Sequence, residues 1–215
     1  MNKSKITILF FLLFVLGFGV IASRFIMPFS IDAKADLKTS YLFPEPKKLK
    51  PFSLTDQKGR LFTNEQLKGK WSLIFLGFTS CPDVCPTTMG KLASAYGQLT
   101  QHRPLQIIFL SVDPKRDTQS KLESYMNFFN PNFVAVTGEH IQLYPLSRDL
   151  GMVYAMVGEG KDYTVDHSAS MALISPDGAK VAIIKPKSVH NQLPQINTDD
   201  LIADIAAIQQ LYRKV

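Results

Sequence analysis

Apolar residues fall into one long N-terminal run and then into short runs separated by polar, glycine- or proline-containing turns. The long run, residues 6–22, carries no charge, and Thr7 is its single polar side chain. Short apolar runs bounded by turn residues are typical of buried strands. Such runs lie at 71–78, 105–112, 171–174 and 181–184. The pattern therefore predicts a hydrophobic N-terminal segment followed by a globular domain built around a sheet.

Helices are predicted between these strands. Pro86 suits the first turn of a helix that continues to about Thr100, because a proline there gives up no hydrogen bond. Asp117 or Thr118 is the expected cap of a helix that ends near Phe129. Further expected elements are a hairpin of 52–54 with 61–63, a helical turn at 64–68, an edge strand at 133–136, a helix at 141–150, a strand at 153–157 and a helix at 199–211.

The order of these elements predicts an α/β fold. Alternating strands and helices pair their strands in parallel, whereas the Pro-Asp-Gly turn at 175–178 adds an antiparallel hairpin. A mixed central sheet flanked by helices, in three layers with an added N-terminal hairpin, is a thioredoxin-like layout. The expected organisation is an anchor at 1–26, a tether at 27–46 and the thioredoxin-like domain at 47–215.

The N-terminal run is long enough for one transmembrane helix, which needs about 20 apolar residues and at least about 17. Lys3 and Lys5 precede it and favour a cytoplasmic N-terminus. A cleaved signal peptide, cut after Val20 and Ala22, is the alternative, but its apolar region is usually only about 7–15 residues. No arginine-rich transit segment precedes the run. We therefore expect a single-pass protein of the bacterial inner membrane with its domain in the periplasm.

Charge excludes one class of partner. The chain has 24 basic and 18 acidic residues, and three of the basic ones belong to the expected anchor. The remaining balance is mild, and no dense lysine or arginine stripe is interleaved with aromatic residues. Nucleic acid is therefore not an expected partner.

The two cysteines of the chain, Cys81 and Cys85, lie where the strand 71–78 meets the helix that contains Pro86. A disulfide stabilises least when it closes so short a loop, so the pair suits a redox or metal site better than a structural bridge. A helix N-terminus stabilises a thiolate, so at least one thiol should have a lowered pKa. Residues four apart share a helix face, and two thiolates suit Cu(I) or zinc.

A metal site would need a third donor, and four histidines are candidates. His102 lies near a helix end, and His140 and His190 lie in polar surroundings, so all three are expected at the surface. His167 comes just before the strand 171–174. In a thioredoxin-like sheet that junction faces the cysteine loop, so His167 is favoured as a ligand over a loop imidazole bonded to a carbonyl group.

Three motifs in this order resemble the SCO/SenC family. They are GFTSCPDVCP at 77–86, SVDPKRDT at 111–118 and DYTVDHSA at 162–169. The similarity extends from about Phe52 to the C-terminus. The resemblance implies a membrane-anchored, thioredoxin-fold copper protein that serves the assembly of cytochrome c oxidase.

The resemblance also implies a ligand set and partners. Copper, as Cu(I) or Cu(II), would be held by Cys81, Cys85 and His167 and delivered to the binuclear copper centre of the oxidase. The implied partners are the copper-bearing oxidase subunit, the membrane, and either another copper chaperone or a thioredoxin-like reductant. Ser80 stands where the family usually has histidine, which removes an extra donor but none of these three.

Two other functions would use the same thiols. A thiol–disulfide oxidoreductase, with Cys81 and Cys85 as catalytic residues, would reduce the cysteines of the oxidase copper site. That chemistry could survive the loss of His167, whereas tight copper binding should not. A peroxidase ranks last, because no threonine-proline-x-x-cysteine loop surrounds Cys81.

The charged residues of the second motif are expected to be structural. Asp117 would cap the following helix, and Arg116 would pair with Asp113. Docking of a partner on this motif is the less favoured alternative.

Overall fold

The computed structural model describes residues 36–160, 162–187 and 194–212. The predicted anchor at 1–26 lies outside these ranges, as do the first residues of the predicted tether. Within the described ranges, no helix is both long enough and apolar enough to cross a bilayer.

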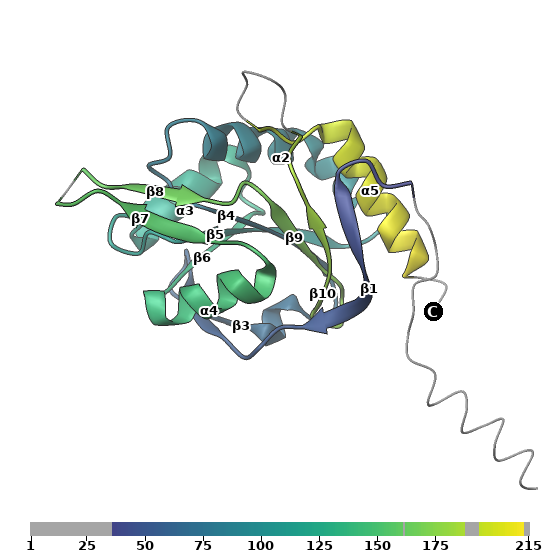
Figure 1. Ribbon diagram of the computed structural model, residues 1–215, viewed down its shortest axis with the longest axis horizontal. Helices are drawn as coiled ribbons and strands as arrows, with labels where there is room; N and C mark the ends of the chain where they lie inside the picture. The colour runs from purple at the N-terminus through teal and green to yellow at the C-terminus, as the bar shows by residue number, and fades with distance from the viewer. Residues whose placement is uncertain (1–35, 161, 188–193, 213–215) are drawn as a thin grey trace, which may run out of the picture. The chain divides into compact units, whose positions relative to one another are not determined.

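A mixed sheet forms the centre of the domain. Its strand order within the described residues is β1-β10-β9-β4-β5-β6-β2-β3. The strands are β1 (Ser40–Lys48), β2 (Ser53–Asp56), β3 (Leu61–Thr63), β4 (Trp71–Gly77), β5 (Leu105–Ser111), β6 (Val134–Thr137), β9 (Met171–Ile174) and β10 (Ala179–Ile184). The neighbours β4, β5 and β6 pair in parallel, and the remaining pairs are antiparallel. The strands β7 (Tyr154–Val157) and β8 (Thr164–His167) form a separate antiparallel hairpin that projects from the domain (Figure 1).

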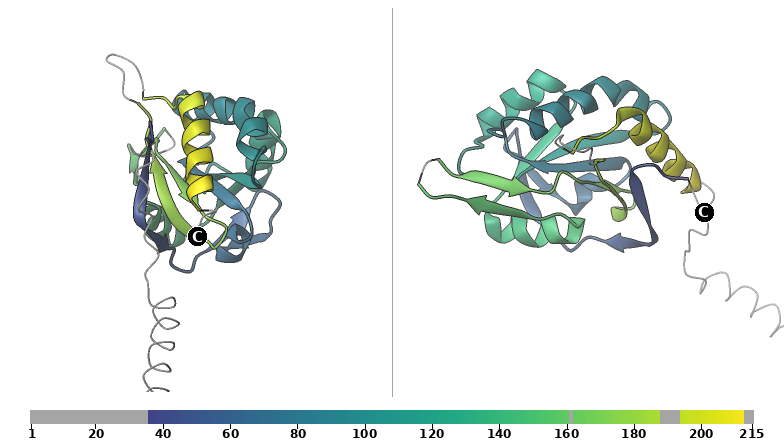
Figure 2. Two further views of the ribbon diagram at one scale, coloured as in Figure 1. Left: turned by 90° about the vertical axis from the view of Figure 1, so that its right-hand side faces the viewer. Right: turned by 45° about the horizontal axis from the view of Figure 1, so that its top comes forward.

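Helices cover both faces of this sheet. They are α2 (Val84–Thr100), α3 (Gln119–Phe129), α4 (His140–Leu150), α5 (Thr198–Leu211) and the short 3-10 helix η1 (Asn64–Leu67). Successive strand side chains point to opposite faces. In β4, Leu73 and Phe75 pack with α2, α3 and α5, whereas Ile74 and Leu76 pack with α4. Figures 1 and 2 show the strands between these two layers. The predicted mixed α/β, thioredoxin-like layout is confirmed, including the hairpin β2–β3.

Residues 40–46 form a strand, whereas the sequence pattern predicts a tether there. They belong to β1, which pairs with β10 from Ser40 opposite Ile184 onward. The strand carries Pro44 and Pro46, and its register shifts between Leu42 and Lys47, so no period-two pattern marks it. Edge strands tolerate proline, because one side of their backbone is not paired.

Two other elements differ from the prediction. The strand β6, expected at an edge, lies inside the sheet because the hairpin β2–β3 extends the sheet beyond it. The strand β8 was not predicted, and it pairs with the predicted strand β7 to form a hairpin.

The entry into β1 is held by Asp204 of α5. Its buried carboxylate accepts hydrogen bonds from the backbone N–H groups of Lys38, Thr39 and Ser40, each at 2.8 Å, and from the Thr39 hydroxyl at 2.9 Å. Burial by itself would raise the pKa of Asp204, but the hydrogen bonds from Lys38 and Thr39 hold that pKa below its ordinary value. Asp204 therefore stabilises the fold in its ionised form.

Asp204→Asn is expected to lower the free energy of unfolding at pH 7 by about 2–3 kcal/mol, because an amide NH2 cannot accept from a backbone N–H. Since the folded-state pKa lies below the unfolded value of about 3.9, the contribution of the carboxylate is complete above that value. It disappears as the pH falls through the folded-state pKa. Thermal unfolding of wild type and variant should therefore differ at pH 7 and converge in acid.

The control is Asp36→Asn, because the Asp36 carboxylate is exposed and pairs with the side chain of Lys38. An exposed pair contributes at most about 1 kcal/mol, so this change should be nearly silent. An Asp204→Asn deficit that stays constant down to acid pH would contradict the prediction.

Candidate metal centre

The loop between β4 and α2 presents the two cysteines. The helix α2 begins at Val84, two residues earlier than predicted, so Cys85 lies within its first turn and Cys81 lies in the loop before it. The Phe78 carbonyl oxygen accepts a hydrogen bond from the Cys81 N–H at 3.2 Å, which closes a turn around the loop. Pro86 lies in the first helical turn, as predicted.

The structure brings the three predicted side chains together. The sulfur atoms of Cys81 and Cys85 and a ring nitrogen of His167 all lie within 4.8 Å of one another. Cys85 Sγ is 3.3 Å from His167 Nε2. Cys85 is fully buried, whereas Cys81 and His167 are half-buried. Two sulfur donors and one nitrogen donor therefore face a common point that is accessible from one side.

The second nitrogen of His167 fixes the tautomer. Nδ1 is 3.0 Å from the backbone carbonyl oxygen of Ser168, so it carries the proton and donates it to that oxygen. Nε2 is then left with its lone pair directed at the sulfur atoms. The imidazole bonds to a carbonyl group, as the alternative interpretation had it, and this bond prepares the other nitrogen for a metal.

His167 is the last residue of β8 and lies opposite Tyr154 of β7. Its ring contacts those of Phe75 and Phe78 edge-on, with centroids 6.2 Å and 6.0 Å apart. Ser168, the next residue, exchanges hydrogen bonds with the backbone of Val153 and so closes the base of the hairpin. The imidazole is therefore held on a paired strand and against two buried rings.

The two thiols differ in acidity. A hydrogen bond from the Cys85 thiol holds the pKa of Cys81 well below its usual range. The same neighbouring sulfur and burial raise the pKa of Cys85. The sequence predicts at least one acidic thiol, and that thiol is Cys81. The main cause is the second cysteine, whereas the prediction rested on the helix N-terminus.

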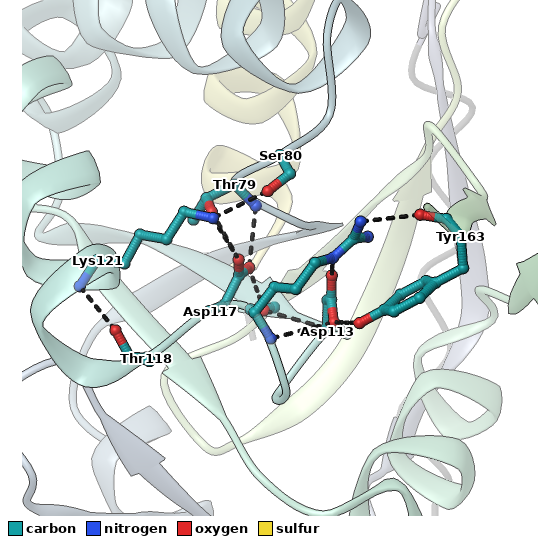
Figure 3. Close-up of polar contacts among 9 residues, drawn as sticks. Thr79, Ser80, Asp113, Asp117, Thr118, Lys121 and Tyr163 are labelled. Atoms are coloured by element: carbon teal, nitrogen blue, oxygen red, sulfur yellow. Dashed lines mark hydrogen bonds and ion pairs between the residues drawn. The ribbon is translucent and has the colours of Figure 1, made fainter. Parts of the chain in front are cut away.

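The prediction that Asp117 caps the following helix was wrong. The hydroxyl oxygen of Thr118 caps α3, accepting from the Lys121 N–H at 3.3 Å. The carboxylate of Asp117 is buried and accepts from the Thr79 N–H at 2.9 Å, the Thr79 hydroxyl at 2.6 Å and the Ser111 hydroxyl at 2.7 Å (Figure 3). Asp117 therefore fastens the start of the cysteine loop to the end of β5.

Among the described residues, the other two histidines, His102 and His140, take no part in this group. His102 is exposed, as expected. His140 is half-buried, and its Nδ1 is 2.9 Å from the Tyr154 hydroxyl, so the expectation that it faces solvent was wrong. His190 lies outside the described residues.

A cleft of about 540 Å³ opens beside the three donors. The cleft is lined by two of the three donor residues and by apolar and charged side chains. They include Cys81, Val84, Val165, His167, Lys185 and Pro186. A ligand from another molecule therefore has room to approach the half-buried sulfur and imidazole.

Comparison with known proteins places this geometry in context. The model of the SCO1/SenC family matches residues 43–199. A Stutzerimonas stutzeri protein named as a candidate copper-binding protein is 36% identical over 172 residues, which are 77% of this chain and 84% of that protein.

Solved structures agree in fold. The crystal structure of Arabidopsis thaliana ScoI with copper bound superposes with a TM-score of 0.64 at 31% identity, covering 77% of this chain and 98% of that one. BsSco, described as a member of the Sco family of cytochrome c oxidase assembly proteins with a disulfide switch, superposes with a TM-score of 0.60 at 25% identity. The superposition covers 80% of this chain and 98% of the BsSco chain.

Proposed function

The chain belongs to the SCO1/SenC family, and we propose that it is a copper metallochaperone whose ligands are Cys81, Cys85 and His167. The observation that carries the proposal is the convergence of two sulfur atoms and one imidazole nitrogen within 4.8 Å. The copper-binding names of its relatives support copper as the cargo.

The donor set suits copper in both oxidation states. Two thiolates are soft ligands that favour Cu(I), and an imidazole also accommodates Cu(II). Three protein donors leave the metal under-coordinated, and the half-buried Cys81 and His167 border an open cleft. A ligand of an acceptor protein could therefore enter and withdraw the metal.

The acceptor we propose is the copper-bearing subunit of cytochrome c oxidase. The description of the structural relative BsSco as a member of a family of oxidase assembly proteins supports this choice. Residues 1–26 would anchor the protein in a bacterial inner membrane, with the domain in the periplasm. The uncharged run 6–22, preceded by Lys3 and Lys5, supports that location.

A thiol–disulfide oxidoreductase is the second candidate, because the half-buried Cys81 lies beside Cys85 and has a lowered pKa. The Cys81 thiolate would attack a disulfide of the target, forming a mixed disulfide and releasing one target thiol. Cys85 would then displace the second target thiol. The target disulfide ends reduced, and Cys81 and Cys85 end joined.

Copper titration of the full-length protein tests the main proposal and separates it from the alternative. Wild type should take up one copper ion per chain and show thiolate-to-copper absorption. Cys85→Ser should lose both, because a single thiolate remains. His167→Ala should lose tight binding while its thiols still exchange with a disulfide. His102→Ala, which changes an exposed imidazole, is the control and should match wild type.

The opposite outcome is equally specific. Weak copper uptake by wild type, together with rapid thiol–disulfide exchange that persists in His167→Ala, would replace the metallochaperone with the oxidoreductase. Unchanged copper affinity in His167→Ala would remove this residue from the ligand set.

A further inference from the structure

Arg116 lies between two aromatic rings that belong to different halves of the site. Its guanidinium carbon is 5.5 Å from the ring centroid of Phe78 and 3.9 Å from that of Tyr163. Phe78 precedes the cysteine loop, and Tyr163 precedes β8. The side chain of Arg116 therefore contacts both segments that supply the metal donors.

Phe78 connects this contact to the cysteines. Its carbonyl oxygen accepts the Cys81 N–H, and its buried ring meets the His167 imidazole edge-on at 6.0 Å. A shift of this ring would change both the loop and the face on which the imidazole rests.

Tyr163 connects Arg116 to the histidine. Nη1 of Arg116 donates to the Tyr163 carbonyl oxygen at 2.8 Å, and the Tyr163 hydroxyl donates to Asp113 at 2.5 Å (Figure 3). Tyr163 lies immediately before β8, and His167 is the last residue of that strand. The position of Tyr163 therefore sets where the strand that carries His167 begins.

Asp113 stabilises this arrangement by balancing the charge of the half-buried guanidinium. Its carboxylate is fully buried and pairs with Nε of Arg116. A planar guanidinium can stack on two rings while its edge donates to a carboxylate and a carbonyl group, and an ammonium group cannot do this. The predicted ion pair of Arg116 with Asp113 is confirmed, but the side chain does more than pair.

We propose that Arg116 is a positioning residue that sets the separation between the cysteine pair and His167. It bridges the Phe78 side and the Tyr163 side and so keeps the three donors convergent before any metal arrives. Only one consequence of this proposal, that the site accepts copper, rests on the proposed function. The bridge itself is a property of the chain without metal.

The test compares Arg116→Lys with Arg60→Lys in the full-length protein. Arg60 also pairs with a buried carboxylate, that of Asp56, but lies in the turn between β2 and β3. Without metal, nuclear Overhauser contacts between the rings of Phe78 and His167 should be clear in wild type and Arg60→Lys. They should weaken or vanish in Arg116→Lys, because lysine keeps the charge but loses the planar bridge.

Copper gives a second measurement. Cu(I) uptake by the two thiolates should persist in Arg116→Lys, whereas Cu(II) affinity should fall at least about 10-fold, as for other groups that orient a ligand. The Cu(II) thiolate absorption should shift or broaden as the imidazole is released. Arg60→Lys should keep the wild-type spectrum.

Substitutions of Tyr163 decide the matter if Arg116→Lys does not fold. Tyr163→Phe keeps the ring and the backbone carbonyl group but removes the hydroxyl that donates to Asp113, so it should weaken the Phe78–His167 contacts less than the loss of the ring does. Tyr163→Leu removes the stacking ring and should reproduce the loss of the Phe78–His167 contacts. Wild-type contacts and spectra in Tyr163→Leu, or in Arg116→Lys where that variant folds, would overturn the proposal. If wild type binds no copper, the proposed function fails, yet the metal-free ring contacts still decide this inference.

Discussion

Replacing Asp117 with alanine is expected to lower the free energy of unfolding by about 3–5 kcal/mol. The change leaves the buried Ser111 hydroxyl and the half-buried N–H and hydroxyl of Thr79 without their acceptor. Each buried donor left unsatisfied costs about 1–3 kcal/mol. The cysteine loop would also lose its attachment to β5, so metal binding should weaken together with stability.

Thermal unfolding measures this effect. For a domain of this size, 1 kcal/mol corresponds to about 2–4 °C, so Asp117→Ala should lower Tm by roughly 10 °C. Asp117→Asn keeps one acceptor oxygen, and the two hydroxyl groups can turn to accept from its NH2. About half of the loss is therefore expected for this variant.

Asp83→Ala is the matched control. Asp83 is an exposed aspartate of the same loop, and its side chain makes no capping hydrogen bond to α2. The change should alter stability by less than about 0.5 kcal/mol. An Asp117→Ala variant as mild as Asp83→Ala would show that the carboxylate does not hold the loop.

The central strands could be predicted because burial on both faces leaves a clear mark on the sequence. The runs that became β4 and β5 are apolar almost throughout, and each is fully buried. The strands β1 and β8 left no such mark. β1 is a half-exposed edge strand with two prolines, and β8 is four residues long with one buried position. β1 pairs with β10, which lies far along the chain, so local periodicity does not reveal this pairing. β8 is too short to show a period, although its partner β7 is its neighbour in the sequence.

The same distinction applies to the site. The convergence of Cys81, Cys85 and His167 could be predicted, because their side chains carry distinctive chemistry and the strand order brings their segments together. Asp117 could not be assigned to the loop, because its acceptor role involves Thr79, 38 residues away. Its neighbour Thr118 offered a local cap signal that was correct for the helix. Local rules identified the cap, and only the tertiary structure shows the role of the aspartate.

Gly77, at the end of β4, was also missed as a part of the site. A Cβ atom built there would lie 2.8 Å from Cys85 Sγ and 2.8 Å from Phe109 Cε2. Both neighbours are fully buried, so neither can move away freely. The absence of a side chain at position 77 therefore makes room for the sulfur atom of Cys85.

Gly77→Ala is expected to lower the free energy of unfolding by about 2–3 kcal/mol, the upper part of the range for overpacking a core. The added methyl group would also displace the Cys85 sulfur atom, which is now 3.3 Å from His167 Nε2. Copper affinity should therefore fall at least about 10-fold, because a ligand atom itself is displaced. Chemical denaturation and copper titration measure the two effects on one preparation.

Gly90→Ala and Gly97→Ala are the matched controls, because both glycines lie on α2, the helix that carries Cys85, and a Cβ atom at either meets nothing within 4 Å. Alanine within a helix is more favourable than glycine by about 0.5–1 kcal/mol, so these variants should be slightly stabilised and should bind copper as wild type does. If Gly→Ala lowers the free energy of unfolding at position 77 but raises it at positions 90 and 97, the loss at position 77 comes from the packing against Cys85. If Gly77→Ala instead keeps wild-type stability and copper affinity, the sulfur has room to move, and glycine at position 77 is not required for the site.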